Sequence, residues 1–331
     1  MNNTLFVLMD GAKDHPNPEL GGKEPLEAAD MPFIKSNVKT HGRTTGRGYT
    51  HLFLNEFFTG HPPALERGVL EAMGMGMDLS NGRTAFRLSP AYLRNGMVEW
   101  AYNTEGFYRK LQQTVSECVD IAKDYDPEIR FFVSGRAILT MNCDVVEDLP
   151  GPPVATPQKE IPGPMGDIIK AVSNKMGGIV DYPWGCGRFT HQYPRFECLD
   201  NLKAFSDSPT SLGICASLGY DIDMITDFDA RFPAARKALE HGNVFLHLDE
   251  IDEYSHMRKV EKKIEILEHS DELMEKYFSD VDRIVYFIDH GTSSITGEHL
   301  PVETPFWTNY DTDIEDDELV PVSQLLPRLM R

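Results

Sequence analysis

Three largely apolar, strand-like runs in this 331-residue chain each end directly in an acidic residue. These runs are residues 4–9, 243–248 and 283–288, and they are followed by Asp10, Asp249 and Asp289. Short continuous apolar runs are typical of strands that are buried on both faces of a parallel sheet. Because helical patterns alternate with these runs in the last third of the chain, we expect an α/β fold whose mostly parallel sheet is flanked by helices.

Acidic and histidine side chains should therefore collect at one edge of this sheet, since the carboxyl ends of parallel strands meet there. Three carboxylates and three imidazoles belong to this group: Asp10, Asp252, Asp289, His256, His290 and His299. A mixed Asp/His set suits one or two divalent ions such as zinc or manganese. Because no cysteine belongs to the group, a purely structural zinc site is not indicated.

The net charge of the chain limits the kinds of molecule that we expect it to bind. The chain has 32 Lys and Arg against 52 Asp and Glu, a net charge of −20, which argues against nucleic acid or an anionic membrane as the main partner. No apolar run approaches the roughly 18 residues of a membrane helix. The five cysteines form no CxxC pair, so we expect a soluble protein of a reducing cytoplasm. The sequence leaves the oligomeric state open.

The length predicts two domains, at roughly 100 to 200 residues per domain. Residues 78–159 have strand-like and helical patterns of a small α+β unit, and this unit ends in the proline-rich run 149–164, which we interpret as a linker. We therefore predict a core formed by residues 1–77 and 160–331, with residues 78–159 inserted as a smaller domain that covers the substrate.

Several sequence blocks closely resemble one known family. They are Asp10-Gly11, Leu20-Gly-Gly-Lys-Glu-Pro-Leu-Glu-Ala-Ala-Asp-Met-Pro32, His51-Leu52 through Leu65–Gly74, Gly185-Cys-Gly187, Val244–His256, Asp289-His290 and His299. In this order they resemble the archaeal-type 2,3-bisphosphoglycerate-independent phosphoglycerate mutases, which belong to the alkaline phosphatase superfamily. The resemblance runs along nearly the whole chain. It implies an alkaline-phosphatase-like core with an inserted α+β domain.

The resemblance also implies two divalent metal ions, manganese or zinc, or else magnesium. One ion would be held by Asp252, His256 and His299, and the other by Asp10, Asp289 and His290. Two such ions can clamp a phosphoryl group and activate a hydroxyl nucleophile. The substrate would be a small phosphorylated or phosphonylated carboxylic acid.

The chain departs from the family at the nucleophile. The family's serine lies four residues before the histidine that corresponds to His51, and that position is Arg47 here. Thr44, Thr45 and Thr50 are nearby hydroxyls, and we predict that Thr45 substitutes for the serine because a shortened loop could shift it by two residues. This departure argues against the family's own mutase reaction.

Arginines near the expected site are candidates for binding the substrate's phosphate or carboxylate. Arg43 and Arg47 are candidates for a guanidinium fork. We assign Arg47, together with Thr45, to the catalytic step. We assign Arg43 and His51 to substrate binding. Arg87 and Arg136 are the candidate anion contacts from the inserted domain.

The resulting prediction is a two-metal phosphomutase-like or phosphotransferase-like enzyme, an isomerase or a transferase. Two alternatives stay open. The chain could be a transferase of phosphonate metabolism that acts without a phosphoenzyme, so that loss of the serine has no consequence. It could also be a catalytically inactive homologue that keeps its metals and binds an anion or a partner.

Overall fold

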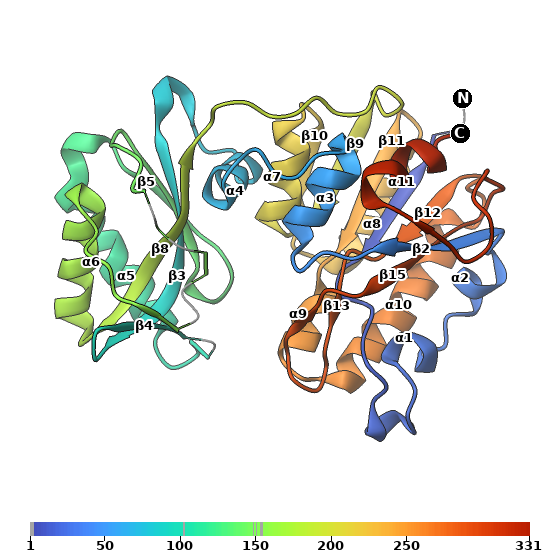
Figure 1. Cartoon of the computed structure of the whole chain (residues 1–331), viewed down its shortest axis with the longest axis horizontal. Helices are drawn as coiled ribbons and strands as arrows, with labels where there is room; N and C mark the ends of the chain where they lie inside the picture. The colour runs from blue at the N-terminus through green and yellow to red at the C-terminus, as the bar shows by residue number, and fades with distance from the viewer. Residues whose placement is uncertain (1–2, 102, 148, 150, 153–154) are drawn as a thin grey trace. The chain divides into compact units, whose positions relative to one another are not determined.

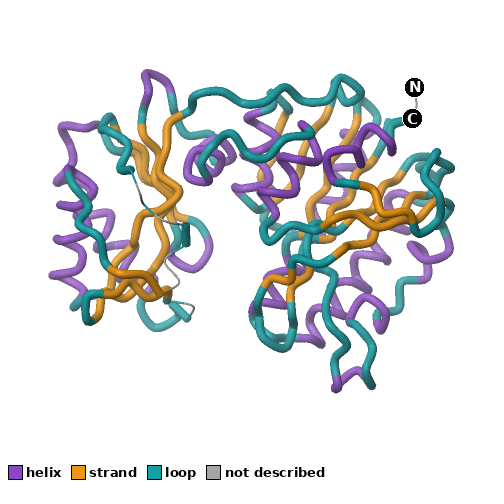
Figure 2. Tube along the Cα trace, in the orientation of Figure 1, coloured by secondary structure: helices purple, strands orange, loops and turns teal. Residues whose placement is uncertain are grey.

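The computed structural model describes residues 3–101, 103–147, 149, 151–152 and 155–331. The chain forms two compact units (Figure 1). The first consists of Met1–Pro63 and Tyr193–Arg331, and the second of Ala64–Gln192. Figure 2 shows that both units combine helices with strands.

The first unit is built on a sheet that has eight strands among the described residues, in the order β10-β9-β11-β1-β12-β15-β2-β16. The strands are β1 (Leu5–Met9), β2 (Thr40–Thr45), β9 (Leu202–Ser206), β10 (Asp221–Met224), β11 (Asn243–Leu248), β12 (Ile284–Phe287), β15 (Glu303–Thr308) and β16 (Glu318–Val320). The five strands from β10 to β12 are parallel, and β15 is antiparallel to both of its neighbours. The predicted α/β class, with a mostly parallel sheet, is confirmed.

Helices cover both faces of this sheet. They are α1 (Pro25–Ala28), α2 (Pro32–Ser36), α3 (Thr50–Thr59), α7 (Pro209–Ser217), α8 (Phe228–Leu239), α9 (Glu250–His256), α10 (Val260–Phe278) and α11 (Val322–Leu329). Leu5 and Val7 of β1 pack with α8 and α10, while Phe6, on the opposite face, meets α3. In the described part of the chain no helix is both long and apolar enough to cross a membrane.

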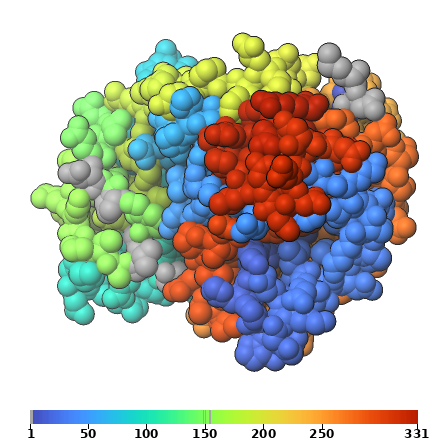
Figure 3. Space-filling view, turned by 45° about the vertical axis from the view of Figure 1, so that its right-hand side comes forward, coloured from blue at the N-terminus to red at the C-terminus, as the bar shows by residue number. Residues whose placement is uncertain are grey.

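A layer of aromatic rings fixes α3 on the sheet. The ring of Phe57 stacks on Phe287 of β12 with 4.7 Å between centroids, and Phe53 of the same helix lies 6.0 Å from Phe287. Phe58 meets Phe245 of β11 edge to face at 5.7 Å. On its other side, α3 packs against α11, and Figure 3 shows the dark red C-terminal segment beside the blue segment that contains α3. These contacts hold the first turn of α3 at the edge of the sheet where the parallel strands end.

The second unit is an antiparallel sheet with helices, as predicted for an α+β domain. Its strands are β3 (Thr84–Arg94), β4 (Met97–Trp100), β5 (Glu128–Phe131), β6 (Ala137–Met141), β7 (Ala155–Pro157) and β8 (Ile179–Arg188). Its helices are α4 (Arg67–Gly74), α5 (Tyr108–Val119) and α6 (Gly163–Met176). The long strand β3 pairs with β4, β6 and β8, and α5 and α6 contribute to the core.

The predicted insert, residues 78–159, lies within the second unit, which also contains α4, α6 and β8. Three positions of the proline-rich run, 150, 153 and 154, lie outside the described residues. Beyond them, β7 pairs with β4. The run therefore contributes an edge strand rather than separating two domains, and a proline is tolerated in an edge strand because its missing N–H can face solvent.

Truncating the aromatic layer should destabilise the first unit. Phe57→Ala removes a side chain that is fully buried, and we expect it to lower the free energy of unfolding by about 3–5 kcal/mol. The control Val38→Ala truncates a side chain that is 38% exposed and should change it by less than about 0.5 kcal/mol. Urea unfolding followed by circular dichroism measures both. An equal effect of the two substitutions would contradict this account of how α3 is held.

Candidate metal centre

The ends of three adjacent parallel strands bring acidic residues to one edge of the first unit's sheet. In β1, Met9 is level with Leu248 of β11, and Leu8 is level with Phe287 of β12. The residues that follow, including Asp10 after β1 and Asp249 after β11, therefore leave the sheet side by side. The structure thus brings together carboxylates that are about 240 to 280 residues apart in the chain, as the registers require.

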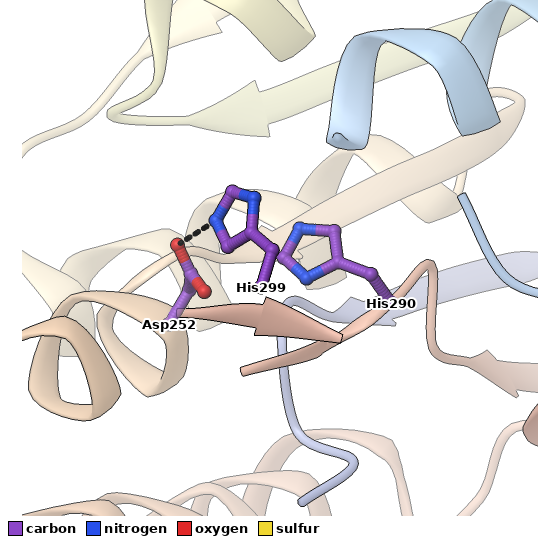
Figure 4. A group of neighbouring side chains, drawn as sticks. All are labelled: Asp252, His290 and His299. Atoms are coloured by element: carbon purple, nitrogen blue, oxygen red, sulfur yellow. Dashed lines mark ion pairs between the residues drawn. The ribbon is translucent and has the colours of Figure 1, made fainter. Parts of the chain in front are cut away.

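The first ligand group is Asp252, His256 and His299. Asp252 and His256 lie one turn apart on α9, so their side chains share a face, and Oδ2 of Asp252 is 3.1 Å from Nε2 of His256. His299 comes from β14 (His299–Leu300), which pairs with β13 (Gly291–Thr292), and its Nε2 is 3.8 Å from the same Oδ2 (Figure 4).

The Nε2 atoms of the two imidazole rings in this group face each other, an arrangement that a cation would stabilise. Nδ1 of His256 lies 2.7 Å from the carbonyl oxygen of Gly297, and Nδ1 of His299 lies 2.8 Å from that of Gly48. A carbonyl oxygen only accepts hydrogen bonds, so each Nδ1 carries a hydrogen. In the neutral rings both Nε2 lone pairs then point at each other, 2.9 Å apart. A proton on one Nε2 or a shared cation removes this repulsion, and the donor set therefore fits a metal ion that takes the place of the proton.

The second ligand group is Asp10, Asp289 and His290, all of them buried. Nε2 of His290 is 3.2 Å from Oδ1 of Asp10 and 3.3 Å from Oδ2 of Asp289. That Oδ2 of Asp289 is buried and accepts no hydrogen bond. A buried carboxylate oxygen that accepts no hydrogen bond is costly, and a divalent ion satisfies it. This group also fits a metal ion.

The two groups are contiguous. The rings of His290 and His299 lie 4.3 Å apart between centroids, and Figure 4 shows the His299 ring between the Asp252 carboxylate and the His290 ring. Asp252, His290 and His299 also have ligand atoms close enough to one another to share an ion. The two groups therefore form one contiguous cluster of candidate ligands in the first unit.

The hydroxyl that lies at this centre is that of Thr50, the first residue of α3. Its Oγ1 is 3.2 Å from Oδ2 of Asp10 and 3.2 Å from Nε2 of His290. Thr45, the predicted substitute for the serine, ends β2 opposite Glu303, and no hydrogen bond described for it reaches the ligands. Spacing in the sequence does not show the path of residues 46–49, which lead from the strand to the start of α3 and decide which threonine reaches the ligands.

Contacts to distant parts of the chain fix the path of residues 46–49. Gly46 donates its N–H to the carbonyl of Val302, which lies so close that a Cβ at position 46 would collide with it. The N–H of Arg47 is bonded to the carbonyl of Asp289. The hydroxyl of Thr44 points away and donates to the carbonyl of Val320 at 2.7 Å. Of Thr44, Thr45 and Thr50, these contacts leave Thr50 at the ligands. The buried Thr292 also lies there, but its hydroxyl donates to the carboxylate of Asp252.

The predicted guanidinium fork is not formed as a free pair of cations. Arg43 is exposed and bonds the carboxylate of Glu303. Arg47 is half-buried and donates two hydrogen bonds, of 2.9 and 2.6 Å, to the carboxylate of Glu56. His51 follows Thr50 on α3, with its ring 5.8 Å from that of Tyr49. Both arginines are thus neutralised by acids, Arg43 by one that is 260 residues away and Arg47 by one that is nine residues away.

The two arginines predicted from the insert belong to the second unit. Arg87 on β3 is 3% exposed and forms an ion pair with Glu71 of α4. Its guanidinium lies 5.5 Å from the ring of Trp184, and burial lowers its pKa to about 9. Arg136 is near enough for its charge to contribute to that lowering. Arg87 is therefore a buried member of an ion pair rather than an exposed anion contact.

His247 and Asp249 also lie at the candidate ligands, although neither is among the site residues that the sequence predicts. His247 lies inside β11 and is fully buried, with Nε2 2.7 Å from Oδ2 of Asp10 and 3.6 Å from Oδ1 of Asp249. Burial raises the pKa of the Asp249 carboxyl, and the charges of Asp10 and Asp207 act in the same direction. A histidine inside an otherwise largely apolar strand, close to its acidic end, is the signal for this site in the sequence.

A buried lysine braces the loops that carry the ligands. The ammonium of Lys263 on α10 donates to the carbonyls of Gly11 and Thr292, both at 3.0 Å, and to the carboxylate of Asp14 at 3.2 Å. Gly11 has φ of +60°, and a Cβ there would collide with Asp252. The chain after Asp10 can therefore pass close to the ligands only as glycine.

Burial and charge crowding set the protonation of the acids. Burial raises the pKa of Asp10 well above its ordinary value, and the charges of Asp289 and Asp252 raise it further. Burial alone would also raise the pKa of Asp252, but the neighbouring His256 holds it well below the ordinary value. Divalent cations would relieve the repulsion among these carboxylates.

Comparisons with known proteins relate the chain to metal-dependent enzymes. Residues 213–313 match the model of the metalloenzyme superfamily, and residues 60–170 match that of 2,3-bisphosphoglycerate-independent phosphoglycerate mutase. The enzyme of that name from Saccharolobus islandicus is 25% identical, with 89% of this chain and 85% of the relative covered. The one from Methanopyrus kandleri is 27% identical, with 92% and 87% covered.

Two solved structures share the fold. A protein from Pyrococcus horikoshii superposes with a TM-score of 0.73 at 18% identity, covering 99% of this chain and 97% of its own. The cofactor-independent phosphoglycerate mutase from Thermoplasma acidophilum superposes with a TM-score of 0.58 at 17% identity, covering 99% of each chain. At these identities the similarity establishes the architecture, and it agrees with the α/β core and smaller second unit.

Ion binding should strengthen with pH. Burial lowers the pKa of His256, but the Asp252 carboxylate outweighs this effect and raises it to about 9. Below pH 9 a proton therefore competes with the ion for His256, so the apparent association constant for Mn²⁺ should rise about tenfold per pH unit between pH 6.5 and 8.5. Calorimetric titration at several pH values measures this slope. A Mn²⁺ affinity that does not change over this range would contradict the role of His256.

Proposed function

We propose that this divergent relative of the 2,3-bisphosphoglycerate-independent phosphoglycerate mutases is a metal-dependent phosphoryl-transfer enzyme with two divalent ions. Its substrate would be a small phosphorylated or phosphonylated carboxylic acid. The observation that carries the proposal is the position of the Thr50 hydroxyl, 3.2 Å from both Asp10 and His290 and beside a second ligand group. A hydroxyl among six metal-binding side chains is an arrangement suited to phosphoryl transfer.

The ions would be manganese or zinc, or else magnesium, held by the two groups described above. When bound, such ions neutralise phosphoryl oxygens and favour ionisation of a nearby hydroxyl. The buried carboxylates supply the negative charge that retains them. The rest of the reaction depends on residues of the chain.

In the proposed step, Thr50 takes the place of the family's serine. Its oxygen forms a bond to phosphorus while the bond between phosphorus and the donor's oxygen breaks. The hydroxyl proton has Asp10 as its acceptor, and the departing donor oxygen takes up a proton. In the reverse direction, the phosphoryl group passes from Thr50 to an acceptor hydroxyl.

The first turn of α3 suits the phosphoryl group. The helix begins at Thr50, and no side chain caps its N-terminus. The first N–H groups of a helix point outward and carry partial positive charge, so they favour an anion. This matters in a chain of net charge −20, because its overall field repels anionic substrates.

A transferase that moves a phosphono group directly to an acceptor hydroxyl is the second candidate. The observation that favours it is Arg47, which occupies the family's serine position and is neutralised by Glu56. Such an enzyme would need the ions but no covalent intermediate on Thr50. The following experiment separates the two candidates.

Replacing Thr50 should abolish covalent phosphorylation. We expect wild-type protein supplied with Mn²⁺ and ³²P-labelled phosphoglycerate to become labelled on the peptide that contains residue 50. Thr50→Val keeps the shape but lacks the hydroxyl, and should lower both labelling and transfer by at least about 1,000-fold. Thr50→Ser should retain them.

Thr45→Val is the matched control, because it makes the same change in a strand residue that lies outside the ligand groups. It should leave both labelling and transfer intact. Transfer without any labelled protein would favour the direct transferase instead. If neither phosphoesters nor phosphonates were turned over by metal-loaded protein, a non-catalytic binding role would be the correct reading.

Removing one ligand should remove one ion. Asp252→Asn takes the negative charge from the first ligand group, and we expect the bound Mn²⁺ to fall from two ions per chain to one. Asp280→Asn makes the same change in an exposed residue and should keep both ions. Elemental analysis after gel filtration gives the counts. Two retained ions in Asp252→Asn would contradict the assignment of ligands.

A further inference from the structure

Four histidines lie at the candidate metal centre, and three of them belong to the ligand groups. Their Nδ1 atoms face different kinds of chemical group. In three of them Nδ1 faces a backbone carbonyl: Gly297 for His256, Gly48 for His299 and Gly291 for His290. Because a carbonyl cannot donate, these rings carry their hydrogen on Nδ1. Their Nε2 atoms are then free to bind an ion.

His247 is placed differently, because a hydroxyl and no described carbonyl faces its Nδ1. Nδ1 of His290 also lies 3.2 Å from the hydroxyl of Thr292, but that hydroxyl donates to Asp252 and so can accept from Nδ1. Oγ of Ser206 lies 2.8 Å from Nδ1, and the same Oγ accepts the N–H of Ser208 at 2.8 Å. A carboxylate only accepts hydrogen bonds, so Nε2 of His247, which faces Oδ2 of Asp10, is the donor there, and Nδ1 accepts the hydroxyl hydrogen of Ser206. Nε2 of His247 then carries the ring hydrogen and donates it to Oδ2 of Asp10 at 2.7 Å.

We infer that His247 is a positioning residue: Ser206 fixes its tautomer, and it orients the Asp10 carboxylate for the second ligand group without binding an ion itself. The inference rests on the proposed function, because it gives Asp10 the role of a metal ligand. It adds a histidine and a serine that act through Asp10, from two strands adjacent to each other in the sheet.

The contacts of Asp10 show what this orientation does. Its Oδ2 receives hydrogen bonds from His247 and Thr50, while its Oδ1 faces Nε2 of His290 at 3.2 Å. The carboxylate therefore presents Oδ1 to the ligand group and is held by Oδ2. Hydrogen bonds to the outer side of a metal ligand commonly fix its direction in this way.

Packing keeps the His247 ring in place. The side chain has no exposed surface, and its ring is nearly parallel to that of Phe245, at 6.1 Å between centroids and 9° between planes. Ser206 is also fully buried at the end of β9. A ring that is enclosed on all sides and bonded at both nitrogens can direct Asp10 with little freedom.

A third ion held by Asp10, His247 and Asp249 is the competing reading, because their ligand atoms also lie close together. It requires a lone pair on Nε2 of His247, which would have to face the Asp10 oxygen 2.7 Å away. The hydroxyl at Nδ1 favours the opposite tautomer. A count of three ions per chain would therefore overturn the inference.

The test compares Mn²⁺ binding by variants of the full chain. We expect His247→Phe, which keeps an aromatic ring but has no donor, to weaken one of the two Mn²⁺ binding steps by about 10- to 100-fold and to leave the other unchanged. His247→Gln, which retains a side-chain N–H, should recover most of the lost affinity. Ser206→Ala should weaken the same step, whereas the control Ser270→Ala removes a buried hydroxyl from α10 and should change neither.

A structural role would give a different result, because a loosened fold weakens both steps and is not rescued by glutamine. Thermal unfolding of the metal-free variants identifies any variant that fails to fold, and His247→Gln and Ser206→Ala then decide the question. Long-range ¹H–¹⁵N spectra of zinc-loaded protein should place the hydrogen of His247 on Nε2. Equal Mn²⁺ affinities in all variants, or a hydrogen on Nδ1, would overturn the inference.

This experiment is independent of turnover. If the wild type binds two ions but transfers no phosphoryl group, the proposed function fails while the effect of His247 on the second ligand group is still measured. If transfer occurs and the His247 and Ser206 variants bind Mn²⁺ normally, only the positioning role fails.

Discussion

The burial of carboxylates at the ends of adjacent parallel strands is the constraint on which this structure depends. Asp10 and Asp289 are almost completely removed from water, with Asp252 close to them, and their charges repel one another. Buried acids of this kind persist only if they are protonated, hydrogen-bonded or paired with cations. The lysine, the threonines and the histidines around them supply part of this compensation, and divalent ions would supply the rest.

The surrounding fold can be understood as support for this arrangement. The aromatic layer under α3 holds Thr50 at the carboxylates, and Lys263 ties together the loops that follow Asp10 and precede His299. Gly11 allows the chain to pass where no side chain would fit. The acids behind the net charge of −20 thus differ in their surroundings. Most are solvated, whereas the few at the strand ends are buried and need cations to balance their charge.

Some of the site could be predicted from local pattern. The spacing of Asp252 and His256 places both on one helix face, and apolar runs that end in acids identify the ligand edge of a parallel sheet. Other features depend on contacts between distant segments. Arg43 is paired with Glu303, and Arg47 is bonded to both Glu56 and the Asp289 backbone, so neither forms the expected fork. The same long-range bonds place Thr50 rather than Thr45 at the ligands, and spacing alone could not show this.

The central claim is that two divalent ions occupy the strand-end centre, one in each ligand group. Anomalous X-ray diffraction from crystals grown with Mn²⁺ tests it most directly, because the signal locates the metal itself. The account predicts two anomalous peaks, one among Asp252, His256 and His299 and the other among Asp10, Asp289 and His290. Crystals that contain Mn²⁺ but show no peak at either group would contradict it.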